Sequence, residues 1–204
     1  MTNRILFFIF FISLLFGCAG HSTFALKQLT NSEHIQINKN GVSIFVRPFI
    51  KTDELQNYFA EDLVQKGILP IQLHILNESE SDIGITTDSF LLLPPDGNVI
   101  NTATSDDAYR NAKSGYGATP IFTIAFLTVG FLGSIGNVTD ANIKLSSDLQ
   151  SKLLKSGIVQ KHRFSDGVVF FPIKKNIQTL DGWHLSIPVY CRNISETFNI
   201  KIQL

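Results

Sequence analysis

The sequence predicts a mainly β protein, an antiparallel β-sandwich with two or three helices and one apolar helical segment or hairpin. About seven short strand patterns are separated by turn residues, which is typical of a sandwich. They form two blocks, and the helical patterns and the apolar segment lie between the blocks. Hydrophobic residues make up 44% and charged residues 17% of the 204 residues, which supports a core and excludes a disordered chain.

Two strand patterns open the folded part. Residues 34–38 and 42–50 are both strand-like, and the Asn-Lys-Asn-Gly at 38–41 between them is a turn signal. Pro48 lacks the N–H that a sheet ladder needs. We therefore expect the second strand to be an edge strand or to end there.

A helix is predicted over residues 53–66. Asp53 caps its N-terminus, Gln56 completes a capping box, and Gly67 follows its last turn. Its apolar face carries four residues at helical spacing: Leu55, Tyr58, Phe59 and Leu63. Such a stripe is far more often a docking face than a ligand site, so we expect this helix to pack on the domain.

A half-buried strand is predicted over residues 68–76, because apolar and more polar residues alternate along it. Ile71, Leu73 and Ile75 share the face that we expect to point into the core. The residues expected to pack against them come from the last block of strands: Val169, Phe171, Leu185 and Ile187. A polar turn at 77–82 then leads to a strand over 83–93, which a Pro-Pro-Asp-Gly turn ends.

The rest of the chain contributes two helices and four strands. A short helix is predicted over 105–112 and a longer one over 139–156, with Gly157 after it. Strands are predicted over 158–164, 168–173, 183–191 and 197–203, with turns at 165–167, 181–182 and 193–196.

One local pattern adds a fold-level resemblance. The Leu-Pro-Ile at 69–71 leading to the Ile-Leu-Asn at 75–77 loosely resembles the immunoglobulin-like modules of envelope lipoproteins. The resemblance covers about two-thirds of the chain. It implies an immunoglobulin-like sandwich as a single domain over residues 34–204, and it implies no particular ligand.

The N-terminus has the features of a lipoprotein signal. Arg4 precedes an apolar run over residues 5–16, which is short for a membrane span. The Leu-Phe-Gly-Cys at 15–18 resembles the lipobox of bacterial lipoproteins. This resemblance implies that residues 1–17 are a signal peptide, and that Cys18 carries a diacylglycerol and an acyl chain such as palmitate. An ordinary signal peptide and an uncleaved anchor remain the alternatives.

The lipobox also implies a location. Two or three acyl chains anchor a protein stably, because each buried CH₂ contributes about 0.8 kcal/mol. Ala19, in place of an aspartate, resembles an outer-membrane sorting signal. We therefore expect a lipid-anchored protein of the bacterial cell envelope, at the outer membrane and facing the periplasm. Residues 18–33 are small and polar and are predicted to be its tether.

The segment 114–139 carries no charge and is rich in apolar residues and glycine. Six apolar side chains are predicted to contact a membrane or a partner: Phe122, Phe126, Leu127, Val129, Phe131 and Leu132. Exposed to water they would form a patch that soluble monomers avoid. Three interpretations stay open for this segment: packing in the domain or on a partner, a shallow hairpin in the membrane, or a single span.

No motif indicates catalysis, a cofactor or a metal site. The five histidines lack metal-ligand spacing, and neither a P-loop nor a nucleophile elbow occurs. His74 with Asp88 and a serine is only a weak triad candidate. The Lys-His-Arg at 161–163 is interpreted as a solvated turn, and Cys191 as a core residue.

Two function classes remain. Lysine plus arginine and aspartate plus glutamate both total 17, so no basic excess supports nucleic-acid binding. We expect a non-enzymatic binding or structural module without a cofactor. Its partners would be the membrane, through Cys18, and an envelope protein or a second copy, through 114–139. The alternative is a hydrolase or lipid-handling protein whose site forms only in three dimensions.

Overall fold

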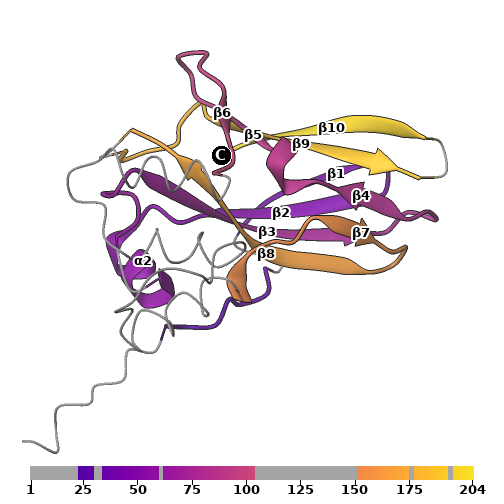
Figure 1. The fold of residues 1–204 in the computed structure, drawn as a ribbon, viewed down its shortest axis with the longest axis horizontal. Coiled ribbons are helices and arrows are strands. Elements are labelled where there is room, and N and C mark those ends of the chain that lie inside the picture. The colour runs from indigo at the N-terminus through magenta and orange to yellow at the C-terminus, as the bar shows by residue number, and fades with distance from the viewer. Residues whose placement is uncertain (1–22, 30–33, 60–61, 104–150, 175–176, 193–194) are drawn as a thin grey trace, which may run out of the picture.

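The computed structural model describes residues 23–29, 34–59, 62–103, 151–174, 177–192 and 195–204. These residues form two antiparallel sheets, with helix α2 (Thr52–Phe59) beside them (Figure 1). The prediction of a mainly β, antiparallel protein is therefore confirmed.

The first sheet has the order β1-β2-β3-β8. Its strands are β1 (Ile35–Lys39), β2 (Val42–Pro48), β3 (Ile68–Asn77) and β8 (Phe164–Pro172). Asn40 and Gly41 both have positive φ angles, 53° and 75°, as a two-residue turn between right-twisted strands requires. The predicted first hairpin is confirmed, and β2 ends at the proline as expected.

The second sheet is built around β9 (His184–Cys191). Strand β10 (Glu196–Gln203) pairs with β9 along its whole length on one side. On the other side β4 (Ile83–Ile85) and β5 (Leu91–Leu93) pair with the two ends of β9. Strands β7 (Gly157–Val159) and β6 (Ile100–Asn101) extend the sheet beyond β4 and β5.

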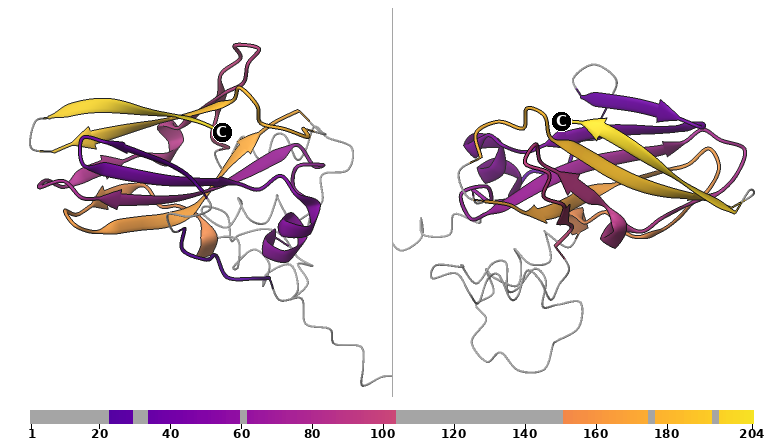
Figure 2. Two further views of the ribbon diagram at one scale, coloured as in Figure 1. Left: turned by 180° about the vertical axis from the view of Figure 1, so that it is seen from behind. Right: turned by 90° about the horizontal axis from the view of Figure 1, so that it is seen from above.

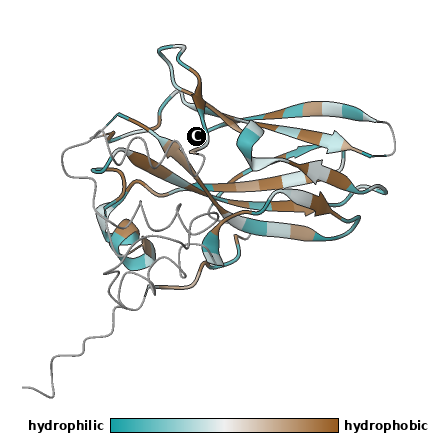
Figure 3. Cartoon of the chain, viewed as in Figure 1, coloured by the Kyte–Doolittle hydropathy of each residue, from teal (hydrophilic) through white to brown (hydrophobic). Residues whose placement is uncertain are grey.

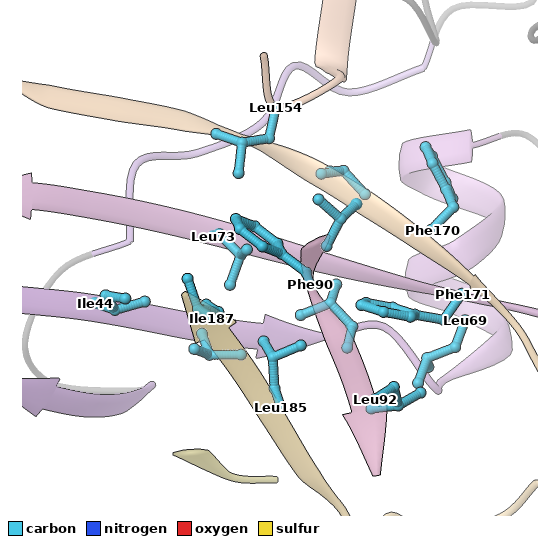
Figure 4. Packing of buried hydrophobic residues seen from close by; sticks show 14 of the residues in the cluster. Ile44, Leu69, Leu73, Phe90, Leu92, Leu154, Phe170, Phe171, Leu185 and Ile187 are labelled. Carbon is cyan, nitrogen blue, oxygen red and sulfur yellow. The ribbon is translucent and has the colours of Figure 1, made fainter. Parts of the chain in front are cut away.

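The inward side chains of the two sheets form one core. Ile44 and Leu73 from the first sheet and Leu185 and Ile187 from the second are completely buried and point into the same space (Figure 4). The inward direction predicted for Ile71, Leu73 and Ile75 is confirmed. Hydrophobic and hydrophilic residues alternate along several of the strands (Figure 3).

A third layer covers part of the outer face of the first sheet. Helix α2 buries Leu55 and Phe59, and the Phe59 ring meets the ring of Phe170 on β8 edge-on, at 6.0 Å between centroids. Residues 23–29, which we call the strap, also lie against the domain, and Leu29 is buried (Figure 2). This layer explains why β3 is buried on both faces and not half-buried as predicted.

The helix predicted over 53–66 is shorter in the structure. It covers 52–59, so Asp53 lies in its first turn and not at the cap. The predicted face is nevertheless buried. Residues 63–67 form a separate turn, in which the N–H groups of Gly67 and Ile68 donate to the carbonyls of Val64 and Leu63. Gly67, at φ 84°, ends this turn as it would end a helix.

Two strand predictions need correction. The strand predicted over 83–93 is broken by η1 (Thr87–Ser89), a short 3₁₀ turn, although both halves lie along β9. The turn predicted at 165–167 is wrong, because β8 runs through it. The turn lies instead at 160–163, where His162 has a φ of 57°.

Of the further helices predicted, the described residues include only the end of the one over 139–156, where Ser151 and Lys152 are helical. The helix predicted over 139–156 is wrong at its end, because Leu153 forms a parallel bridge with Val168 and Gly157 begins β7. The helix predicted over 105–112 and the apolar segment 114–139 lie outside the described residues. Within the part of the chain that is described, no helix has the length and apolarity needed to cross a bilayer.

Candidate functional site: the junction of strap, helix α2 and insertion

None of the residues predicted to be lipidated, or to contact a membrane or a partner, is among the described ones. Cys18 and the six apolar residues of 114–139 (Phe122, Phe126, Leu127, Val129, Phe131 and Leu132) lie outside them. The structure does describe the points where the chain leads into these segments. They are the strap, Thr102 and Ala103 before residues 104–150, and residues 151–154 after them. We call residues 104–150, which include the uncharged segment 114–139, the insertion.

The strap is held by its backbone and by its side chains. The N–H of Phe24 donates to the carbonyl of Asn57 at 2.8 Å, and the Phe24 ring meets Tyr58 edge-on at 5.8 Å between centroids. Farther along, the side-chain amide of Gln72 donates to the carbonyl of Lys27 at 2.7 Å. The sequence predicts a tether over 18–33, and its residues 23–29 lie against the domain.

The Gln72 contact shows that the strap belongs to the folded structure. Gln72 is 1% exposed, and its Oε1 has no hydrogen-bond partner. Turning the amide over would place this oxygen against the Lys27 carbonyl, which accepts but cannot donate. The amide orientation that bonds the strap therefore leaves one buried oxygen of Gln72 without a partner. The alternation of residues along β3 could not predict this bond.

Lys152 connects three segments that are distant in sequence. Its side chain is almost completely buried, and its Nζ donates to Thr23 Oγ1 at 2.7 Å and to the Tyr58 carbonyl at 2.8 Å. A buried ammonium group is costly unless it is hydrogen-bonded. The Lys152 side chain thus joins the strap to the end of α2 and to the chain that follows the insertion. We call this group of Thr23, Phe24, Asn57, Tyr58 and Lys152 the junction.

The insertion begins and ends beside one strand edge. The Ala103 N–H donates to the Phe170 carbonyl at 2.8 Å, and the Leu154 N–H donates to the Val168 carbonyl at 3.0 Å. These carbonyls are two residues apart on the edge of β8 that faces away from β3. The chain therefore leaves the described domain at 103 and returns at 151 by neighbouring positions.

The charges beside α2 are engaged within the domain. Arg47 pairs with Glu54 at 3.2 Å, and its guanidinium lies over the rings of Phe49 and Tyr58, at 4.7 and 5.2 Å from their centroids. Partial burial lowers the pKa of Lys66, in the turn after α2. The Arg47 contacts stabilise the third layer.

The histidine predicted as a weak triad member has a different partner. Asp88 lies in η1 on the second sheet, whereas His74 Nδ1 is hydrogen-bonded to a carboxylate oxygen of Asp166 on β8. Phe45 and Phe164 flank the imidazole, at 5.5 and 5.2 Å between ring centroids. Among the described residues this group is a cross-strand contact between β3 and β8, and the triad with Asp88 is wrong.

Two other predicted features can be placed. Cys191 is half-buried at the end of β9, with its Sγ 3.2 Å from Ser81 Oγ, so its assignment to the core needs correction. The Lys-His-Arg at 161–163 lies in the exposed turn before β8, as predicted. Among the described residues, no three His, Cys, Asp or Glu side chains are grouped as a metal ion would need.

The junction was not visible in the sequence. Lys152 lies in a polar stretch with ordinary helical spacing, and nothing local distinguishes it from an exposed lysine. Its partners are 94 and 129 residues away along the chain. Only the fold brings them together.

Comparison with known proteins gives structural neighbours only. No protein-family model and no curated protein sequence matches the chain. A crystal structure of the yjhA protein from Bacillus subtilis matches with a TM-score of 0.43 and 11% identity, covering 81% of this chain and 94% of that one. A functionally unknown protein from Listeria monocytogenes matches with a TM-score of 0.38 and 14% identity, covering 83% of this chain and 80% of that one.

Proposed function

We propose that the chain is a lipid-anchored lipoprotein of the bacterial cell envelope, at the outer membrane and facing the periplasm. Its domain acts as a non-enzymatic binding or structural module. The two packed sheets form an immunoglobulin-like sandwich, and residues 114–139 form an apolar helix or helical hairpin that contacts the membrane or a partner.

One observation supports this proposal more than any other. Lys152, just after the insertion, is hydrogen-bonded to Thr23, which lies five residues after the predicted lipidation site. The chain that comes from the predicted anchor and the chain that returns from the insertion therefore meet at the same place on the domain. An apolar segment needs a cover other than water, and a lipid anchor that starts near the return of the insertion supports the bilayer, or a partner at the bilayer, as that cover.

The anchor is tested by the variant Cys18→Ser. We expect it to lose labelling by an alkyne analogue of palmitate and to leave the membrane fraction, because the thiol that receives the lipid is gone. Cys191→Ser is the matched control and should keep both properties. Labelling that persists in Cys18→Ser would contradict the proposed anchor.

The role of the insertion is tested by capture from membranes solubilised in detergent. Residues 118–136 are replaced by a short Gly/Ser linker, and the proteins that co-purify with this variant and with the wild type are compared by mass spectrometry. We expect one or more specific partners, or copies of the chain itself, to be lost. Val99→Ser, at an exposed apolar residue of the loop before β6, is the control and should keep them. An unchanged set would refute partner binding through the insertion.

A further inference from the structure

We propose that the strap holds the domain against the bilayer surface, and that the Phe24 ring enters the lipid interface there. This inference rests on the proposed lipid anchor and adds to it a surface, an orientation and a partner, namely the membrane itself. It depends on described contacts of the strap and on the length of chain that precedes them.

The chain between Cys18 and the docked strap is short. Five peptide units separate Cys18 from Thr23, and they reach at most about 18 Å when fully extended. A free tether over 18–33 would reach about 50 Å. Because Thr23 is bonded to the buried Lys152 and the Phe24 N–H to Asn57, the longer reach is not available while the strap is docked.

The aromatic side chain of the strap is exposed. Phe24 packs one side against Tyr58, yet 55% of the residue is exposed. A phenyl ring gains free energy when it moves from water into the boundary between headgroups and acyl chains. The Phe24 ring is exposed, and it lies close in sequence to the predicted anchor at Cys18.

A cluster of loops lies at the end of the domain opposite α2. The turn at 40–41 bonds to Glu78, and Asn77 bonds to His162, so the loops at the far ends of β2, β3 and β8 form one cluster. Figure 1 shows this cluster at the opposite end of the strands from α2. A domain held by its strap would therefore present these loops to the periplasm and α2 to the membrane.

The test uses tryptophan fluorescence in the lipidated full chain. Trp183 is the only tryptophan, so Trp183→Phe provides a silent background. Phe24→Trp is the probe. Phe164→Trp is the matched control, since Phe164 is 54% exposed and lies beside the loop cluster at the end of the strands opposite α2. Both variants are purified from membranes, their acylation is verified by mass spectrometry, and they are reconstituted into phosphatidylethanolamine and phosphatidylglycerol vesicles.

We expect the tryptophan at 24 to shift its emission to the blue, to lose most of its quenching by aqueous acrylamide, and to be quenched by brominated lipid. The tryptophan at 164 should show none of these changes. If acylated protein gives the same aqueous quenching at both positions, the proposed orientation is overturned while the anchor stands. A chain found without acyl groups would overturn the anchor, and this inference with it.

A longer connection provides a second test. Fifteen Gly/Ser residues inserted after Gly20 leave every described contact of the strap in place and lengthen only the chain to Cys18. The acrylamide quenching of the tryptophan at 24 should then rise toward that of the control position. Acrylamide quenching that stays low despite the longer connection would show that the short chain between Cys18 and Thr23 does not position the ring.

Discussion

Gly167 marks a place where two backbones pass too closely for a side chain. It lies in β8 with its missing Cβ directed at Leu154, whose side chain is buried in the core. A Cβ at this position would lie less than 3.0 Å from backbone atoms of Leu153 and Leu154. The sequence predicts that Gly167 lies in a turn. In the structure it is instead required because the chain that returns from the insertion passes close to β8.

The variant Gly167→Ala should destabilise the domain by about 1–3 kcal/mol or more, because the backbone at 153–154 must move to make room. Equilibrium urea unfolding measures this loss. Gly157→Ala is the matched control, since a Cβ there would meet no heavy atom within 4 Å. It should change stability by less than about 0.5 kcal/mol. Equal effects of the two variants would contradict the close approach.

The pair formed by His74 and Asp166 allows a second prediction at this scale. The side chain of His74 is only 5% exposed, so Asp166→Ala leaves a buried polar nitrogen without its acceptor. We expect a loss of about 1–3 kcal/mol in the free energy of unfolding. Asp166→Asn keeps an acceptor oxygen and should cost less.

Asp88→Ala is the control for this pair. Asp88 is exposed in η1 and is not the partner of the histidine, so its loss should change stability by less than about 0.5 kcal/mol. A larger loss for Asp88→Ala than for Asp166→Ala in urea unfolding would restore the pairing that the sequence predicted.

At the scale of elements, local patterns predicted most strands well. The alternation in β3 and the turn at 40–41 depend on neighbouring residues, which a sequence displays directly. The burial of the outer face of β3 depends instead on Lys27, 45 residues before Gln72, and on helix α2. No local pattern contains that information.

The element errors have the same physical origin. Ser-Asp-Gly at 165–167 has turn composition, but its glycine is needed because the chain at 154 passes beside β8. The apolar periodicity of 139–156 continues to Leu154, but the Leu154 side chain is buried in the core between the sheets and does not belong to a helix face. The lipobox-like pattern at 15–18 is local and could be proposed from the sequence, whereas the contacts of the junction required the fold.

At the scale of the whole molecule, the two ends of the insertion lie on neighbouring carbonyls of β8, those of Val168 and Phe170. A short connection can therefore replace a long one without moving either end. Shortening a loop also lowers the entropy cost of closing it, although by little for each halving of its length. We therefore expect the domain to tolerate a shorter insertion.

The variant with 118–136 replaced by a short Gly/Ser linker, made in the Cys18→Ser background, should keep a cooperative unfolding transition. We expect its free energy of unfolding to lie within about 1 kcal/mol of that of Cys18→Ser alone, because the bonds of Ala103 and Leu154 to β8 are retained. The variant should also lose any residual binding to vesicles or partners that Cys18→Ser still shows. If the domain unfolds instead, residues 118–136 contribute to its core, and their role as an interaction element is wrong.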